Sequence, residues 1–411
     1  MIYVGLMGHG VVGSGVAEVL RKNAAGIAKK AGDRIELRRI LDLREFPELP
    51  YADLFTKSFD DILNDPEIRI VVETMGGLNP AYGYVKQCLL SGKSVVTSNK
   101  ELVASKGAEL LELARDNNLN FLFEASVGGG IPILRPLDQC LAANEVTEIA
   151  GILNGTTNFM LTRMIEDGMT FTEALELASE LGYAERDPSA DVDGHDACRK
   201  ISILASLAFG QHVYPEQIYT EGIRTITPAD VKYAAAMHGV IKLIGRAAKR
   251  GDGKLYGIVT PMIIPDSSLL SDVKDVFNGI MVRGDAIGDV VFYGRGAGKL
   301  PTASAVVADI IDEVKHLGAR KYLFWEQGSE DYVVPHTVGE VSMLVRVTAK
   351  DEAKEFSLAK TAFGDIAVIH AENVPEQELA FTTPKLPEGE LEAKLIGSGL
   401  NVISKIRIGE L

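Results

Sequence analysis

The sequence predicts an α/β protein: a doubly wound parallel sheet, then an α+β region with a mixed sheet, then a small domain of order βαββαβ. Three observations predict this architecture. A short apolar run leads through a glycine turn into a helix, apolar strands then alternate with helical stretches as far as Phe123, and the pattern changes again from about His336. Repeated βα units imply a parallel sheet with helices on both faces. At 411 residues the chain is long enough for two or three domains.

The chain begins with the apolar run Ile2–Met7, and a glycine motif and a helical run follow at once. The motif is Gly8-His-Gly10-Val-Val-Gly13. Gly8 permits a tight turn, Gly10 lets the backbone approach a pyrophosphate, and Gly13 permits close packing of helix on strand. A plain βα turn is the alternative, but a position between strand and helix is the context that the dinucleotide-binding fingerprint requires. We therefore expect a Rossmann-type domain over residues 1–130 with NAD or NADP as cofactor.

Further strands and helices continue this pattern. The expected strands are Ile35–Leu41, Ile68–Val72, Ser94–Thr97 and Asn120–Phe123, and the expected helices include Pro80–Leu90 and Glu101–Asn117. Ligands of such sheets bind beyond the carboxyl ends of the strands. Glu73–Gly77 and Ser98–Lys100 each follow a strand directly, so both segments are expected at the cofactor crevice.

The end of the second strand bears on the choice of cofactor. It reads Leu41-Asp-Leu-Arg44. An acid at this position binds a ribose 2′-hydroxyl and favours NAD, whereas an arginine accommodates the 2′-phosphate of NADP. Asp42 and Arg44 are both present, so the sequence leaves the preference open.

The stretch Ala178–Lys200 concentrates acidic residues and one positioned lysine in a turn that runs into a helix. Gly182 marks the end of one helix, and Asp187-Pro188 forces extended backbone before the next helix, which is expected to begin near Asp193.

Asp196 and Lys200 lie four residues apart on that helix. They therefore share a face, with the ammonium one turn above the carboxylate. One interpretation is a surface ion pair, which contributes only about 0.3–0.5 kcal/mol. The other is a catalytic pair.

The whole stretch resembles the signature of the homoserine dehydrogenase family, in which a small residue, a glycine, an Asp-Pro, a hydrophobic-x-Gly-x-Asp step and a lysine follow at fixed intervals. The matching residues are Ala178, Gly182, Tyr183, Ala184, Asp187, Pro188, Asp191, Val192, Gly194, Asp196 and Lys200. The resemblance covers most of residues 1–317. It implies a homodimer that interconverts L-homoserine and L-aspartate 4-semialdehyde with NAD(P), on the route to threonine and methionine.

Reduction of an aldehyde by a nicotinamide requires an acid that protonates the developing alkoxide. Lys200 fits this need, because a partly desolvated ammonium loses pKa, while Asp196 favours its charged form. By resemblance, Lys200 is the acid/base, and Asp196 and Glu185 hold the substrate. Lys100 is a rival proton donor. Asp191 is a further acceptor for the substrate ammonium or, alternatively, a helix N-cap.

A second glycine-rich segment, Gly294–Ser304, resembles the loop that returns the chain of this family to the cofactor crevice. The helix Ala305–Leu317 is expected to pack on the first sheet, so that about 296–318 completes the dinucleotide-binding domain. Residues 131–318 then form the substrate-binding and dimerisation domain. Its strand-like segments include Val146–Leu153 and Tyr256–Met262. By position or resemblance, the expected cofactor contacts are Gly8, Gly10, Val11, Val12, Gly13, Arg44, Thr74, Lys100 and Gly298.

The chain leaves the first domain through Glu124–Pro132, which contains three consecutive glycines. From the residues alone this segment is a flexible joint. The family resemblance implies that Glu124, Val127, Gly129 and Ile131 hold a sodium ion (Na+), largely through main-chain oxygen, the ligand type that hard cations prefer.

From about His336 the expected elements follow the order βαββαβ of a ferredoxin-like domain over residues 336–411. They are strand Val341–Thr348, helix Phe356–Phe363, strand Ile366–His370, strand Glu378–Thr382, helix Gly389–Leu395 and strand Val402–Ile408. The region resembles the ACT-type regulatory domain of many homoserine dehydrogenases, although Ala349–Ala353 stands where such domains show an Asp-x-Pro-Gly turn. Amino-acid binding and a structural or dimerising role are therefore both open.

The composition argues against several other classes. A net charge of −15 repels phosphate backbones, so no nucleic-acid partner is expected. The sequence has three widely spaced cysteines, no basic n-region and no apolar run of about 18 residues, so we expect a cytoplasmic protein without a membrane partner. The alternatives to the expected enzyme are a dehydrogenase for another amino-acid-derived carbonyl and an inert cofactor-binding regulator.

Overall fold

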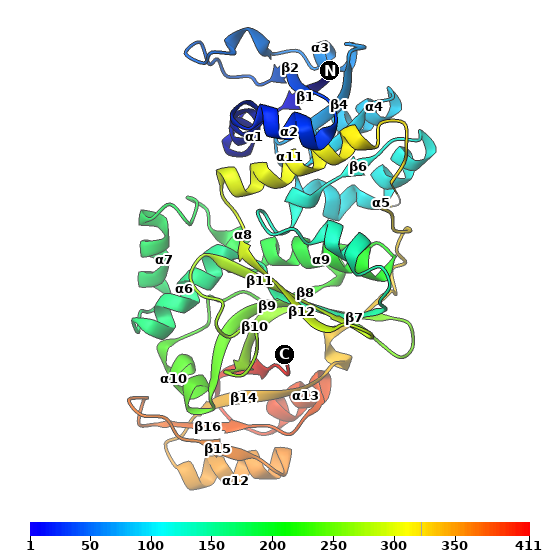
Figure 1. Ribbon diagram of the computed structural model, residues 1–411. Helices are drawn as coiled ribbons and strands as arrows, with labels where there is room; N and C mark the ends of the chain where they lie inside the picture. Colours follow the sequence, from blue (N-terminus) through cyan, green and yellow to red (C-terminus); the bar gives the residue numbers. More distant parts are fainter. Residues whose placement is uncertain (322) are drawn as a thin grey trace. The chain divides into compact units, whose positions relative to one another are not determined.

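The computed structural model describes residues 1–321 and 323–411, which form two compact units. Unit 1 contains Met1–Glu145, Ser202–Pro215 and Gly294–Ser329, and unit 2 contains Val146–Ile201, Glu216–Tyr293 and Glu330–Leu411. Figure 1 follows the chain through both units by colour. The three-domain division expected from the sequence stays a prediction. No helix in the described part of the chain is long and apolar enough to cross a membrane.

Unit 1 is built on a six-stranded parallel sheet of order β3-β2-β1-β4-β5-β6. The strands are β1 (Ile2–Met7), β2 (Ile35–Leu41), β3 (Phe55–Thr56), β4 (Ile68–Glu73), β5 (Ser94–Thr97) and β6 (Phe121–Leu122). This is the strand order of the Rossmann fold, so the predicted doubly wound sheet is confirmed. The order reverses between β1 and β4, and the crevice beyond their carboxyl ends is the ligand-binding position of such sheets.

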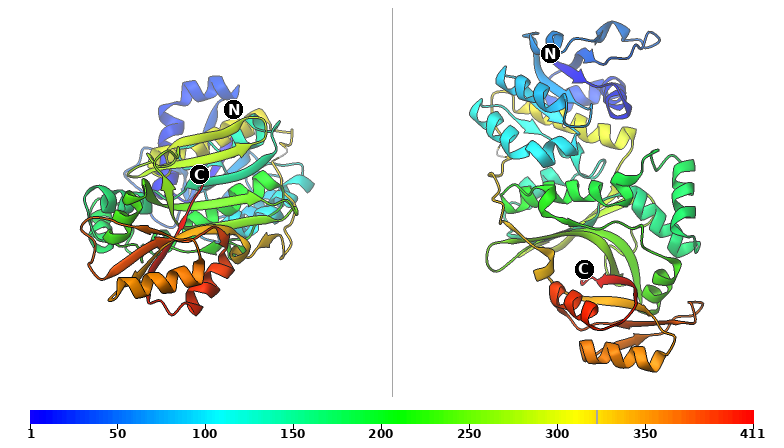
Figure 2. Two further views of the ribbon diagram at one scale, coloured as in Figure 1. Left: turned by 90° about the horizontal axis from the view of Figure 1, so that it is seen from below. Right: turned by 180° about the vertical axis from the view of Figure 1, so that it is seen from behind.

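Helices cover both faces of this sheet. They are α1 (Val11–Lys22), α2 (Ala24–Ala31), α3 (Asp60–Leu63), α4 (Ala81–Leu90), α5 (Lys100–Asp116) and α11 (Lys299–Lys315). The helices α1, α2 and α11 pack on one face, because Val16, Ile27 and Val306 share a core cluster with Val4 and Val72 of the strands. Figures 1 and 2 show α4 and α5 on the other face.

The close approach of α1 and α11 depends on a glycine that the fingerprint does not include. A Cβ on Gly15 would lie 2.8 Å from the Lys299 carbonyl oxygen and 2.9 Å from the Ala303 Cβ. The helix α11 begins at Lys299, earlier than the predicted helix Ala305–Leu317, and it packs on the first sheet as expected.

The single tryptophan of the chain, Trp325, is buried in unit 1. Its Nε1 donates to His212 Nδ1 at 2.9 Å, and His212 Nε2 therefore donates to the carbonyl oxygen of Ala104, also at 2.9 Å. A Cβ on Gly107 would lie 2.6 Å from the indole ring. These contacts fasten the segment that follows α11 onto α5.

Unit 2 is built on a twelve-stranded mixed sheet whose main path is β12-β11-β7-β9-β10-β18-β14-β16-β15. The first five strands of this path are β12 (Gly288–Arg295), β11 (Phe277–Gly284), β7 (Val146–Ile152), β9 (Gly239–Lys249) and β10 (Leu255–Pro265). Neighbours from β11 to β10 are antiparallel, whereas the short strands β8 (Tyr219–Thr220) and β13 (Val333–Val334) pair in parallel with β10. The mixed sheet expected for this region is confirmed.

Five helices accompany the first half of this sheet. They are α6 (Gly155–Glu166), α7 (Phe171–Glu180), α8 (Ser189–Val192), α9 (His195–Phe209), of which His195–Ile201 belongs to unit 2, and α10 (Pro228–Ala236). The helix α9 is the one predicted to begin near Asp193. The short helix α8 was not expected, because Asp187-Pro188 predicted extended backbone there.

The C-terminal elements follow the predicted order βαββαβ. They are β14 (Glu340–Thr348), α12 (Glu352–Phe363), β15 (Ala367–Ile369), β16 (Glu378–Thr382), α13 (Glu388–Gly397) and β18 (Val402–Ile408), with a short strand β17 (Leu386–Pro387) beside β14. The spatial order β18-β14-β16-β15 is antiparallel throughout, and α12 and α13 cover the same face (Figure 2). The arrangement is ferredoxin-like. An ACT-like function stays a prediction.

One connection was not predicted from the sequence. Strand β18 pairs in parallel with β10 through Met262 with Arg407 and Ile263 with Ile408. The C-terminal strands therefore extend the sheet of unit 2.

Candidate active site

The glycine turn between β1 and α1 is shaped as the fingerprint requires. Gly8 has φ 93°, and a Cβ on Gly13 would lie 2.0 Å from the Gly8 carbonyl oxygen. A Cβ on Gly10 would meet no atom within 4 Å. Gly10 is the N-cap of α1 and no side chain caps this helix end, so the N–H groups of Val11 and Val12 are presented to a ligand.

The residues after β4 brace this turn. Thr74 Oγ1 donates to the carbonyl oxygens of Gly8 at 2.9 Å and Met7 at 3.2 Å. The buried Glu73 carboxylate accepts hydrogen bonds from Met75 N at 2.7 Å and Thr97 Oγ1 at 2.6 Å, and burial raises its pKa. Glu73 therefore holds the loop, although the sequence suggested only a place at the crevice.

Lys100 is the first residue of α5, and only Ser98 and Asn99 separate it from the end of β5. Asn99 fixes this helix start, because its Oδ1 accepts from Leu102 N at 3.1 Å and its Nδ2 donates to Gly77 O at 2.7 Å. The predicted position of Lys100 at the carboxyl end of the sheet is confirmed. The role of Asn99 was missed, although an asparagine before a helix is an N-cap signal.

At the end of β2, Asp42 and Arg44 bind each other. Asp42 Oδ1 accepts from Arg44 N and Nε at 3.0 Å each, and Asp42 Oδ2 accepts from Arg44 Nη2 at 2.9 Å and His9 N at 2.7 Å. These bonds, above all those from the Arg44 guanidinium, hold the pKa of Asp42 far below its usual range. The Arg44 side chain remains 61 % exposed, against 9 % for Asp42.

The segment predicted to hold sodium is buried and tightly folded, so the flexible-joint interpretation is wrong. The Glu124 carboxylate accepts the N–H groups of Ile133 at 2.6 Å, Leu134 at 2.9 Å and Arg135 at 2.8 Å. A Cβ on Gly129, at φ 57°, would lie 2.3 Å from the Gly296 carbonyl oxygen.

Asp309 of α11 supports the same segment and was not predicted. Its Oδ2 accepts from Glu124 N at 2.8 Å, and its Oδ1 accepts from Arg135 Nη2 at 2.5 Å. Burial, with the nearby Glu124 carboxylate, raises the pKa of Asp309 to about 7. The sequence analysis did not predict that Asp309 lies on the buried face of α11.

The predicted pair in unit 2 is present and buried. Lys200 Nζ donates to Asp196 Oδ2 at 2.7 Å and to the Leu153 carbonyl oxygen at 2.8 Å. Lys200 is 7 % exposed and Asp196 4 %. The surface ion pair is therefore the wrong interpretation, because both charged groups are removed from bulk water.

An asparagine joins this pair to a further acid. Asn154 Nδ2 donates to Asp196 Oδ2 at 2.9 Å and to Asp191 Oδ1 at 2.7 Å. Asp191 lies within α8, so the N-cap interpretation of Asp191 is wrong. Asp191, Asp196 and Lys200 thus form one hydrogen-bonded cluster, while Asn154, two residues beyond β7, was missed by the sequence analysis.

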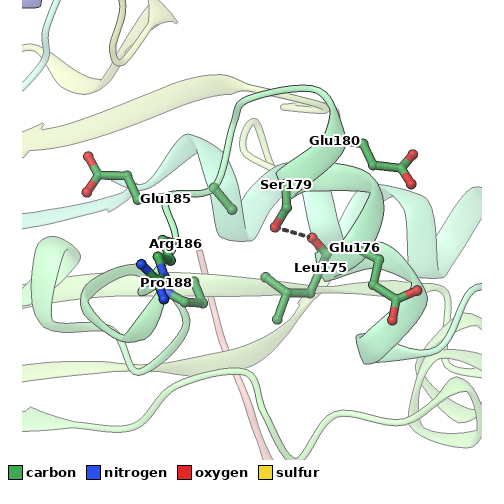
Figure 3. A pocket seen from close by; sticks show the side chains of 8 residues that line it. Leu175, Glu176, Ser179, Glu180, Glu185, Arg186 and Pro188 are labelled. Carbon is green, nitrogen blue, oxygen red and sulfur yellow. Dashed lines mark hydrogen bonds between the residues drawn. The ribbon is translucent and has the colours of Figure 1, made fainter.

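Glu185 occupies a different position in unit 2. It is exposed in the loop after α7 and makes no hydrogen bond to the Lys200 cluster within the described residues. It lines a pocket of about 590 Å³, where its side chain extends away from those of Glu176 and Glu180 (Figure 3). The assignment of Glu185 to the substrate stays a prediction.

These features define a class of protein: an NAD(P)-dependent oxidoreductase with a Rossmann sheet in unit 1 and a buried lysine–aspartate pair in unit 2. Residues 8–124 match the family model described as homoserine dehydrogenase, NAD binding domain, and residues 132–311 match the model described as homoserine dehydrogenase. The chain is 45 % identical over 318 residues to a homoserine dehydrogenase of Synechocystis sp., covering 76 % of this chain and 73 % of the relative. It is 39 % identical over 373 residues to that of Bacillus subtilis, covering 89 % and 86 %.

Solved structures of homoserine dehydrogenases are similar to this chain as well. A homoserine dehydrogenase from Thiobacillus denitrificans superposes with a TM-score of 0.89 at 35 % identity, covering 99 % of this chain and 98 % of that one. A hyperthermophilic archaeal homoserine dehydrogenase in complex with NADPH has a TM-score of 0.66 at 29 % identity, covering 76 % and 97 %. The chain belongs to the homoserine dehydrogenase family, whose members oxidise a CH–OH group with NAD(P) and reduce the resulting carbonyl in the reverse direction.

Proposed function

We propose that this enzyme interconverts L-homoserine and L-aspartate 4-semialdehyde, with Lys200 as the acid/base. The observation that carries this proposal is the buried hydrogen bond of 2.7 Å between Lys200 Nζ and Asp196 Oδ2. In the reducing direction a bound nicotinamide supplies a hydride to the aldehyde carbon. Lys200 Nζ donates a proton to the oxygen as the alkoxide develops, and in the oxidising direction it takes that proton back. Asp196 favours the charged form of the lysine between these steps.

The substrate carries an α-ammonium, for which unit 2 offers carboxylates. We assign Asp191 and Asp196 to this group, since Asn154 already brings them together, and Glu185 as a further acceptor from its exposed loop. Lys100 is assigned to the nicotinamide end of the cofactor by the family resemblance, which its position at the start of α5, just beyond β5, supports. If Lys100 is instead the proton donor, its removal and not that of Lys200 will abolish turnover.

The cofactor is assigned to the crevice of unit 1. Gly8, Gly10 and Gly13 shape the turn, Val11 and Val12 present N–H groups to a pyrophosphate, and the remaining contacts are assigned to Arg44, Thr74, Lys100 and Gly298. We propose that NADP is preferred to NAD, because hydrogen bonds from His9 and Arg44 occupy both oxygens of Asp42, while the Arg44 guanidinium is mostly exposed.

We further propose that Glu124, Val127, Gly129 and Ile131 hold Na+ through main-chain oxygen. The residues fit a hard cation, because the Glu124 side chain is engaged by three backbone N–H groups and the left-handed Gly129 keeps the turn compact. We also propose that the enzyme is a homodimer and that it acts in the cytoplasm. The dimer is supported by the family resemblance, and the cytoplasm by a sequence with only three widely spaced cysteines.

A steady-state assay tests this function. Purified enzyme is given aspartate semialdehyde with NADPH or NADH, with and without threonine and with Na+ replaced by a bulky organic cation. We expect oxidation of the cofactor with semialdehyde, faster with NADPH and slower without Na+. Turnover only with another aldehyde would indicate a different dehydrogenase, and tight cofactor binding without any turnover would indicate a regulator. Light scattering during size-exclusion chromatography tests the dimer.

A further inference from the structure

The Asn154 side chain has two sets of partners on opposite sides. Its Oδ1 accepts from Thr157 N at 2.8 Å and from Thr157 Oγ1 at 2.9 Å, which caps the N-terminus of α6. Its Nδ2 donates to Asp191 Oδ1 and Asp196 Oδ2. Because the cap needs the carbonyl oxygen, the amide cannot be turned around, and both N–H bonds must face the two acids.

The two acids carry like charge in a largely buried place. Asp191 comes from α8 and Asp196 from α9, and Lys200 is the cation hydrogen-bonded to Asp196. Like charges at short range disfavour their own ionisation, whereas hydrogen bonds to the charged form favour it. An amide that donates one N–H to each carboxylate therefore favours the charged form of both and holds the two groups side by side, which neither helix does alone.

We propose that Asn154 is a positioning residue of the reaction. Its amide fixes Asp196 in the orientation that aligns Lys200, and it holds Asp191 beside Asp196 so that two carboxylates face the α-ammonium of the substrate. The inference deepens the proposed function and rests on the roles assigned there to Lys200, Asp196 and Asp191. A cap of α6 with no part in the reaction is the competing role.

Two substitutions separate these roles. Serine and aspartate are both good N-caps, so Asn154→Ser and Asn154→Asp preserve the acceptor for Thr157 N. Asn154→Ser removes both amide N–H donors and leaves one shorter hydroxyl that cannot bridge the two acids, and Asn154→Asp removes both donors and adds a third carboxylate. Thr170→Ala is the matched control, because it removes the capping box of α7 without touching the cluster.

We expect Asn154→Ser to lower kcat/KM for L-homoserine at least about tenfold, the effect of losing a hydrogen bond to a charged group. Asn154→Asp should lower it further. The KM for NADP+ should not change. Without the amide, the Lys200 ammonium supplies more of the stabilisation of the Asp196 carboxylate, which favours the charged lysine, so the basic requirement of kcat for homoserine oxidation should move to higher pH. Thr170→Ala should lower Tm and leave kcat/KM and the pH profile as they are.

Crystal structures of the two Asn154 variants complete the test. We expect the Asp191 and Asp196 carboxylates to move apart and the contact between Lys200 Nζ and Asp196 Oδ2 to lengthen or change partner. A variant with wild-type kcat/KM, pH profile and carboxylate positions overturns the inference, whichever of the two variants is obtained folded. The proposed role of Lys200 fails by a different result, namely unchanged turnover of Lys200→Ala, and the crystal structures report on positioning even in that case.

Discussion

At the scale of single residues, the buried pair of Lys200 and Asp196 bears on the proposed reaction more than on the stability of the fold. Lys200 and Asp196 are both nearly inaccessible to water. Removing two charges from water costs free energy that their attraction only partly offsets, so such a pair is weak evidence for stability. A buried lysine that donates to a carboxylate and to a carbonyl oxygen is instead suited to proton transfer.

The first prediction concerns this lysine. Lys200→Ala should lower turnover by at least about 100-fold, the low end of general acid–base assistance, while NADPH binding stays near that of the wild type. Steady-state kinetics and the fluorescence of bound NADPH measure the two effects. Lys30→Ala, on the exposed side of α2, is the control. Loss of turnover in Lys100→Ala together with normal turnover in Lys200→Ala would transfer the role to Lys100.

The second prediction concerns the choice of cofactor. Arg44→Ala should raise the KM for NADPH roughly tenfold or more, because a charge-assisted bond to the 2′-phosphate is lost, and change the KM for NADH much less. The ratio of the two KM values is the measurement. Arg34→Ala, at an exposed arginine of the same unit, should leave the ratio unchanged. A wild-type enzyme that prefers NADH would contradict the assignment.

At the scale of elements, the sequence predicted what depends on local pattern. The bounds of β1, β2, β5, β16 and β18 agree with the expected strands, because apolar runs between turn signals mark them clearly. The pair Asp196 and Lys200 was predictable because helical spacing places it. Asn154 was not, since its two acids lie 37 and 42 positions along the chain and only the fold brings them to its amide.

The third prediction compares two helical glycines. Gly15→Ala should destabilise the chain by about 1–3 kcal/mol, the usual cost of overpacking, because its Cβ would enter the contact between α1 and α11. Gly26→Ala in α2 meets open space and should stabilise by about 0.5–1 kcal/mol through helix propensity. Urea unfolding of both variants measures the difference. Equal effects of the two substitutions would show that α1 and α11 do not touch at Gly15.

At the scale of the whole molecule, a buried carboxyl group makes the free energy of unfolding depend on pH. Glu313 of α11 is fully buried, and this burial raises its pKa to about 8. The folded state therefore holds a proton that the unfolded chain releases near pH 4.5. The contribution of Glu313 to stability is complete below that pH and is lost as the pH rises to about 8.

The fourth prediction follows from this loss of stability with rising pH. The stability of Glu313→Gln relative to the wild type should increase between about pH 5 and pH 8, by up to about 1.4 kcal/mol per pH unit, and then level off. Urea unfolding at several pH values measures it. Glu48→Gln, at an exposed position, should show a flat difference. A flat difference for Glu313→Gln as well would mean that its carboxyl group is solvated.

The sequence contains one tryptophan, Trp325, so the intrinsic tryptophan fluorescence of this enzyme comes from a single position. Trp325 is enclosed and bonded to an imidazole, so its emission should be blue-shifted in the native protein and should move to the red when the segment after α11 comes away from α5. Because no second indole contributes, the spectrum reports on that one attachment. Stopped-flow fluorescence can therefore measure how fast the segment after α11 packs onto α5, without any introduced dye.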